Sequence, residues 1–183
     1  MDSMNALWMI LIEGLIISAV GTLLHFVYDW SHQNRRVGVV AAVNESTWEH
    51  IKIAIFPMFA AMFVDGFWWS SEANYFIGKL ASLVATIILI LVLFYGYHVF
   101  IKKSILPIDI VIFYIAIFGG QTLFWWLTTL PGCGDFWSYL ALDGIFVLFA
   151  TVLTMTLQPL KNFIFKDPIT DNYGFRGHGK EIK

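Results

Sequence analysis

Charged residues and cysteines are scarce in this sequence, and each scarcity excludes a class of protein. Asp, Glu, Lys and Arg make up 13% of the 183 residues, whereas a soluble domain usually carries about a quarter. An ordinary cytosolic domain and a disordered chain are therefore excluded. Cys133 is the single cysteine, which excludes an internal disulfide framework. The net charge of −2 excludes a basic nucleic-acid-binding protein.

Hydrophobic side chains dominate instead, at 58% of the sequence. A transmembrane helix needs about 20 mostly apolar residues to cross a hydrocarbon core of roughly 30 Å. Five segments meet this requirement: approximately residues 6–28, 47–69, 75–100, 105–127 and 136–157. We therefore predict an all-α, polytopic membrane helix bundle over residues 1–158 and a tail over 159–183. The predicted surroundings are the lipid bilayer of the cell membrane, with a homodimer or a partner membrane protein as the compatible assemblies.

The distribution of Lys and Arg predicts the orientation of the bundle. Nine of the 11 basic residues fall in the first loop, the third loop and the tail: Arg35, Arg36, Lys102, Lys103, Lys161, Lys166, Arg176, Lys180 and Lys183. Cytoplasmic loops carry an excess of Lys and Arg, so we predict an N-terminus outside and a cytoplasmic tail. Lys52 then also lies on the cytoplasmic side, and only Lys79 lies on the outer side. The outer interface also receives an aromatic belt: Trp8, Trp68, Trp69, Trp125, Trp126 and Trp137.

Ionisable side chains occur at membrane depth, where they cost several kcal/mol and often mark a functional site. In the predicted topology they separate into two layers. The outer layer contains Glu13, Asp65 and Asp143, with Gln121 nearby. The inner layer consists of His25, Asp29, Glu45, Glu49, His50, Lys52, His98 and Asp109. The structural alternative places each residue in the headgroup region or at a helix end. It suits the inner-layer residues near span ends, which are Asp29, Glu45, Lys52, His98 and Asp109, better than it suits Glu13, Asp65, Asp143 and His25.

One helical stripe directs part of the inner layer into the bundle. Gly14, Ser18, Gly21, His25 and Asp29 follow one another at spacings of four, three, four and four residues. Small residues at such spacings let helices approach closely, so His25 and Asp29 should face a neighbouring helix. The two side chains could be metal ligands or an acid that orients a base. A hydrogen bond that only stabilises a helix contact is the equally weighted alternative.

The stretch from Asn44 through Glu45, Ser46 and Trp48 to His50 carries an unusual density of polar residues. Ser46 followed by Glu49 three positions later matches a capping box, in which the glutamate accepts the serine backbone N–H. The polar residues exceed what a cap requires. We therefore predict an inner metal cluster for a divalent cation such as Zn²⁺ or Mn²⁺, formed by His25, Asp29, Glu49 and His50.

The tail changes character after Pro159. Residues 160–166 have the composition of an interfacial amphipathic stretch, and residues 167–179 are rich in turn-forming residues. The tail either frays into the cytoplasm or folds back beneath the inner layer. In the second case it would bring Arg176 or His178 to the cluster.

Three stretches give the chain a resemblance to a known group of proteins: residues 24–30, residues 43–50, and the segment from Asp167 and Pro168 to His178. On these motifs the chain resembles a bacterial family of multi-pass membrane proteins that is defined as a domain of unknown function. The resemblance implies that these stretches are hallmarks of the family. It brings no activity, so no catalytic residue can be transferred.

Three functions compete at this point. The first is a small permease or channel-like protein for a cation, a metal ion or protons. It would use an outer relay of Glu13, Asp65, Asp143 and Gln121, with the metal cluster as its inner gate. The second is a metal-dependent hydrolase or transferase at the cytoplasmic leaflet with Glu49 as base, although no known catalytic motif supports it. The third is a non-catalytic assembly partner. We favour the permease.

Overall fold

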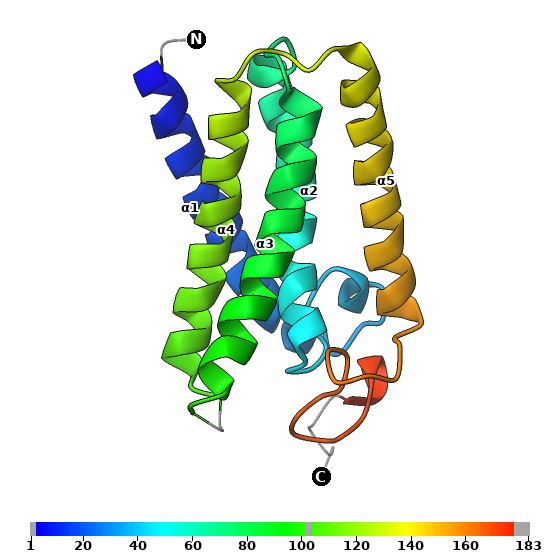
Figure 1. Ribbon diagram of the computed structural model, residues 1–183. Helices are drawn as coiled ribbons and strands as arrows, with labels where there is room; N and C mark the ends of the chain where they lie inside the picture. Colours follow the sequence, from blue (N-terminus) through cyan, green and yellow to red (C-terminus); the bar gives the residue numbers. More distant parts are fainter. Residues whose placement is uncertain (1–2, 102–103, 178–183) are drawn as a thin grey trace.

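The computed structural model describes residues 3–101 and 104–177, and within these ranges it contains five α-helices. They are α1 (Ser3–Trp30), α2 (Thr47–Trp69), α3 (Tyr75–His98), α4 (Leu106–Thr128) and α5 (Asp135–Leu157). Each is long and apolar enough to cross a membrane, which confirms the predicted all-α bundle of five spanning helices. Figure 1 shows α1 starting at the upper end of the bundle and the tail lying at the lower end. These two names are kept below.

The helices alternate in direction and are joined by short turns whose residues fit their positions. Asn74 precedes α3 with a φ of 64°, a left-handed conformation that asparagine tolerates well. Its side-chain Nδ2 donates to the carbonyls of Leu127, Leu130 and Pro131, while its Oδ1 accepts the backbone N–H of Cys133. One buried amide therefore joins the α2–α3 turn to the α4–α5 turn at the upper end.

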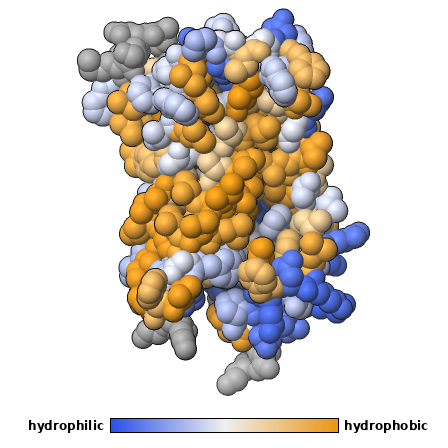
Figure 2. Space-filling model, viewed as in Figure 1, coloured by the Kyte–Doolittle hydropathy of each residue, from blue (hydrophilic) through white to orange (hydrophobic). Residues whose placement is uncertain are grey.

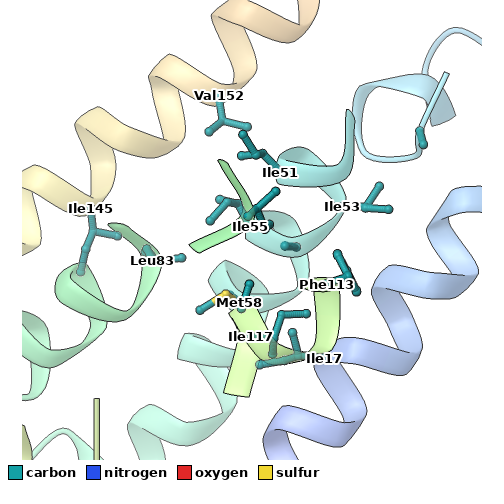
Figure 3. Close-up of a cluster of buried hydrophobic side chains, with 14 residues drawn as sticks. Ile17, Ile51, Ile53, Ile55, Met58, Leu83, Phe113, Ile117, Ile145 and Val152 are labelled. Carbon is teal, nitrogen blue, oxygen red and sulfur yellow. The ribbon is translucent and has the colours of Figure 1, made fainter. Parts of the chain in front are cut away.

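The centre of the bundle is apolar and receives side chains from all five helices. Ile17 of α1 and Met58 of α2 lie beside Ile117 of α4, and all three are at most 4% exposed (Figure 3). Leu83 of α3 and Ile145 of α5 extend the same cluster. Burial of such side chains contributes roughly 1.5–3 kcal/mol each in water. In a bilayer the same close packing supplies van der Waals contact between helices.

Helices α3 and α4 approach most closely where their residues are small. A Cβ added at Gly120 of α4 would collide with Thr86 Oγ1 and lie 2.7 Å from the Ser82 carbonyl of α3. The Thr86 hydroxyl lies 2.9 Å from that carbonyl and 3.3 Å from the carbonyl of Ala116. Small residues and a hydroxyl at a helix contact are typical of packing within membranes.

The outward surface is apolar around the middle of the bundle, and hydrophilic residues gather at the lower end (Figure 2). Many large hydrophobic side chains on this surface are more than half exposed: Phe63, Val64, Phe67, Val92, Ile115 and Val147. A soluble monomer rarely exposes so continuous an apolar surface. Lipid is the solvent that this surface fits.

The lower end is covered by the loop before α2 and by the tail, which contain the short 3₁₀ helices η1 (Val37–Val39) and η2 (Gly174–Gly177). The Asn44 amide donates to the Gly174 carbonyl at 2.8 Å, and the Trp48 backbone N–H donates to the Ile164 carbonyl at 3.0 Å. The described part of the tail is therefore folded back against the loop and the start of α2.

The α3–α4 contact yields a test with a matched control. Replacing Gly120 by alanine forces a Cβ into Ser82 and Thr86, so we expect a loss of about 1–3 kcal/mol in unfolding free energy. A Cβ added at Gly96 of α3 would have nothing within 4 Å of it, so Gly96→Ala should leave stability unchanged or raise it slightly. Denaturant titration of both variants in nanodiscs measures the difference. Equal stability of the two variants would contradict the described packing.

Candidate functional site

Four helices bring polar side chains together at the upper end. Lys79 of α3 lies 3.2 Å from Glu13 Oε1 of α1 and forms a second ion pair with Asp65 of α2. The Tyr75 hydroxyl of α3 donates to Asp65 Oδ1 at 2.6 Å. Gln121 of α4 is fully buried beside Glu13. We call Glu13, Asp65 and Lys79 the acid–lysine cluster.

The acid–lysine cluster contains two carboxylates and one ammonium, so it carries one surplus negative charge when all three groups are ionised. The side chains of Lys79, Asp65 and Glu13 are 4%, 7% and 16% exposed, so water screens them weakly. The ammonium of Lys79 also lies 3.9 Å from the centre of the Phe124 ring, a cation–π contact. An unbalanced buried carboxylate is costly. The cluster is therefore disposed to take up a proton or a second cation.

Two of the predicted outer-layer acids meet here and one does not. Glu13 and Asp65 share Lys79, with Gln121 beside them, whereas Asp143 is exposed on α5. Lys79 and Tyr75 were missed by the sequence reasoning, which treated Lys79 only as a basic residue on the outer side. A lysine within an apolar span requires an acidic partner, and this signal could have found it.

A second polar group forms at the lower end from α1, the loop and α2. One ligand atom each from His25, Glu45 and His50 lies within 4.8 Å of the other two. His25 Nε2 is 3.5 Å from Glu45 Oε1, and the centres of the His25 and His50 imidazole rings are 5.4 Å apart. This group is called the His25–Glu45–His50 site below.

The hydrogen bonds of this site leave ligand atoms available. His50 Nδ1 lies 3.0 Å from the Ser46 carbonyl, which can only accept, so His50 carries a proton on Nδ1 and its Nε2 lone pair remains for a ligand. His25 Nδ1 is buried and has no hydrogen-bond partner among the described residues. The hydrogen bond from His25 lowers the pKa of the Glu45 carboxyl. Glu45 is thus ionised at neutral pH and offers a charged oxygen beside the two imidazoles.

A cavity of about 90 Å³ adjoins the site between α1, α2 and α4. Its wall includes both histidines, Thr22 and Asp109. The Asp109 carboxylate accepts hydrogen bonds from the hydroxyls of Tyr97 and Ser104. The cavity lining is almost entirely apolar, so water or an ion in it would depend on the few polar groups at its wall.

The predicted inner cluster is only partly assembled. His25 and His50 do meet, but the carboxylate next to them is Glu45, whereas Asp29 and Glu49 are outside the three-residue group. Glu49 has another role. Its Oε2 lies 2.5 Å from Lys52 Nζ and accepts the Val43 backbone N–H at 2.9 Å.

The Glu49–Lys52 ion pair anchors the loop to α2. Both side chains are at most 3% exposed, and Lys52 Nζ also donates to the Gly38 carbonyl at 2.9 Å.

The capping-box prediction for Ser46 and Glu49 is wrong. The Ser46 backbone N–H donates to Asn44 Oδ1 rather than to Glu49, and the Ser46 side chain makes no capping hydrogen bond.

The other residues named in the prediction lie outside the two polar groups or outside the described residues. The Trp48 ring stacks on Phe165 of the tail with 4.5 Å between ring centres. His98 Nδ1 lies 2.8 Å from the Phe94 carbonyl within α3. Arg176 is exposed in η2, and His178 lies outside the described residues. Neither Trp48 nor His98 belongs to either polar group.

Comparison with known families places the chain in a group defined by sequence alone. The sequence profile of a family of unknown function, DUF6512, matches residues 2–175. The chain belongs to this family. The DUF6512 match spans all five helices, both polar groups and the folded tail as far as Phe175. No curated protein and no solved structure matches the chain, so any function for this DUF6512 member must be argued from its own residues.

The Glu49–Lys52 pair predicts a large loss of stability on truncation. Lys52→Met keeps the apolar stem and leaves Glu49 buried without its cation, which should cost about 3–5 kcal/mol of unfolding free energy. Adding Glu49→Gln should recover much of that loss, because the buried charge is then gone. Lys161→Met, at an exposed position, is the control. Denaturant titration that finds Lys52→Met as stable as Lys161→Met would refute the anchoring role.

The tail contacts predict a change in protease sensitivity. Asp167 is 1% exposed, and its carboxylate accepts the Glu45 backbone N–H at 3.1 Å and the Thr170 backbone N–H at 2.8 Å. Losing such charged hydrogen bonds costs about 1.5–3 kcal/mol, so Asp167→Ala should raise the population of the detached tail roughly 10- to 100-fold.

Chymotrypsin cleavage after the aromatic residues within 159–177 measures this population. Asp171→Asn serves as the control, because it removes a surface ion pair with Lys166 while asparagine tolerates the φ of 61° at this position. We expect slow cleavage for Asp171→Asn and rapid cleavage for Asp167→Ala. Equal rates for the two variants would show that Asp167 does not hold the tail.

Proposed function

We propose that the chain is a small membrane permease for a cation. The His25–Glu45–His50 site binds the cation at the lower end, and the acid–lysine cluster binds a proton at the upper end. The observation that carries the proposal is that both groups lie along α1, one toward each end of the bundle. Glu13 and His25 are 12 residues apart, which corresponds to about 18 Å along a helix.

The ligand chemistry supports a divalent metal ion as the cation. Two imidazoles and one carboxylate are ligands that Zn²⁺ and related ions accept, and such a three-ligand set leaves positions for water. A set that includes water also suits a transport substrate, since bound cargo must be able to leave. The adjoining cavity supplies space for that water.

The charge of the acid–lysine cluster supports proton exchange. Ionisable groups inside transporters commonly form proton relays. Two carboxylates share one lysine here, so arrival of a proton removes the excess negative charge. Release of that proton restores the charge.

Between the two groups, buried polar atoms lie on α1 and at its contact with α2. Ser18 is fully buried, and its hydroxyl has no hydrogen-bond partner within residues 3–101 and 104–177. A Cβ at Gly21 would lie 2.8 Å from the Ile53 carbonyl, which receives no helical N–H because Pro57 stands four residues later. Ile17, Phe113 and Ile117 belong to the apolar core of the bundle, and the Phe113 ring lies against Gly21. In the proposed permease this packing is a closed state, and passage requires α1 to move against α2 and α4.

The polar groups also bear on the orientation and on the hydrolase alternative. The lower end carries most of the basic residues, so the positive-inside rule supports a cytoplasmic location for it. A hydrolase would use Glu49 as its general base. The Glu49 carboxylate is already paired with Lys52, which argues against that role and favours the permease.

Ion flux into proteoliposomes tests the proposal. We expect vesicles that contain the purified chain to take up Zn²⁺ or Mn²⁺ when their interior is more acidic than the buffer, because protons then leave as the metal enters. An entrapped metal indicator and a pH dye follow the two fluxes. Asp65→Asn should reduce uptake to the level of protein-free vesicles, because the exchangeable charge of the cluster is lost. Asp143→Asn, at an exposed carboxylate of α5, should transport normally.

A metal-binding measurement separates the two ends. The double variant His25→Ala, His50→Ala should lose metal binding in equilibrium dialysis, whereas His98→Ala should retain it. Uptake that equals the protein-free control for Zn²⁺, Mn²⁺ and protons would overturn the proposal. Uptake that Asp65→Asn leaves unchanged would do the same.

A further inference from the structure

A lateral groove of about 480 Å³ lies between α1 and α2, outside the His25–Glu45–His50 site. Its rim consists of large apolar side chains: Ile12, Ile16, Val64 and Trp68 are each 55–58% exposed. The middle of this surface contacts lipid, so the groove opens sideways toward hydrocarbon. Its volume falls within the range of about 300–1,000 Å³ for small-molecule sites.

The polar residues of the groove carry negative charge. Glu13 and Asp65 both line it, and together they bear one charge more than Lys79 balances. Trp69 lines it as well. Trp69 is 3% exposed, and its indole Nε1 has no hydrogen-bond partner in the described part of the chain. The groove thus combines a surplus carboxylate, an unused N–H donor and an apolar wall.

These features define the chemistry of an occupant. A cationic ammonium group would neutralise the surplus carboxylate, and its charge could also lie against an indole face of Trp68 or Trp69. A hydroxyl oxygen next to the ammonium could accept the Trp69 N–H. An aliphatic chain would fill the apolar remainder and extend toward the bilayer. An anionic amphiphile would meet the carboxylates, and a neutral one would leave their charge uncompensated.

We propose that the groove between α1 and α2 binds an amphiphilic amine that enters from the bilayer, with its ammonium head at Glu13 and Asp65 and its aliphatic chain along Ile12, Ile16 and Val64. This site is separate from the metal site of the proposed permease, but it shares Glu13 and Asp65 with the proposed proton-binding cluster. Its occupancy requires no transport, so it can be tested without a metal or a gradient.

Binding of N-dodecylethanolamine is the direct test. The chain is reconstituted into nanodiscs of zwitterionic lipid at neutral pH, and the saturable binding above empty nanodiscs is measured by equilibrium dialysis. The neutral 1-dodecanol and the anionic dodecanoate, which have the same chain length, are the ligand controls. We expect saturable binding of the amine alone.

Three variants locate the site. Glu13→Gln removes one carboxylate at constant size and should weaken amine binding about tenfold or more, since hydrogen bonds to charged groups contribute about 1.5–3 kcal/mol. Ala60→Trp fills the groove without altering a charge and should abolish binding. Asp143→Asn should bind like the unchanged chain. The thermal midpoint of each variant verifies that it is folded.

Two results would overturn the inference. One is binding of 1-dodecanol with the affinity of the amine, because the carboxylates would then contribute nothing. The other is amine binding that persists in both folded variants, Glu13→Gln and Ala60→Trp, because the amine would then lie elsewhere. Failure of metal uptake would leave this test unaffected, so the two proposals can fail separately.

Discussion

The upper half of the bundle is organised around a lysine ammonium buried between two carboxylates. Lys79 of α3 pairs with Glu13 of α1 and Asp65 of α2, and it lies over the Phe124 ring of α4. Because a lone charge at this depth would cost several kcal/mol, each of these helices must keep its rotation about its own axis. The acid–lysine cluster therefore fixes the arrangement of four helices that apolar packing alone would specify weakly. Among the five helices of the described residues, α5 alone is outside this constraint, and its Asp143 is exposed.

The two buried ion-pair systems differ in balance, and this difference separates structure from function. Glu49 and Lys52 neutralise each other, and backbone groups of Val43 and Gly38 complete their hydrogen bonds. This pair is balanced in charge and hydrogen-bonded, so its surroundings do not favour the binding or release of an ion. The acid–lysine cluster has a surplus acid, and His25 and Ser18 retain buried atoms without partners across the described residues. On α1, Ser18 and His25 lie between or within the proposed proton and cation sites, and Trp69 of α2 adds a further unpartnered atom near the acid–lysine cluster.

The helices could be predicted from sequence because apolar length and turn residues are local properties. The partners of the polar residues depend on helix rotation and on loop path, which are not local. Glu45 shows the limit: the sequence pattern assigns Glu49 to the cap and to the metal cluster, yet Glu45 reaches His25 while Glu49 pairs with Lys52. Lys79 could have been assigned an acidic partner from the cost of burying it. Which acids it meets required the packing of α1 and α2 against α3.

The contacts of the tail impose an order of assembly on the His25–Glu45–His50 site. The segment that carries Glu45 is held by the tail: the Asp167 carboxylate accepts the Glu45 backbone N–H, and the Gly174 carbonyl accepts the Asn44 side-chain amide. During synthesis, α1 and α2 enter the membrane long before these residues leave the ribosome. Glu45 cannot gain these supports until translation has passed Gly174. A nascent or prematurely ended chain would therefore have its helices in place while the loop segment that carries Glu45 still lacks these contacts.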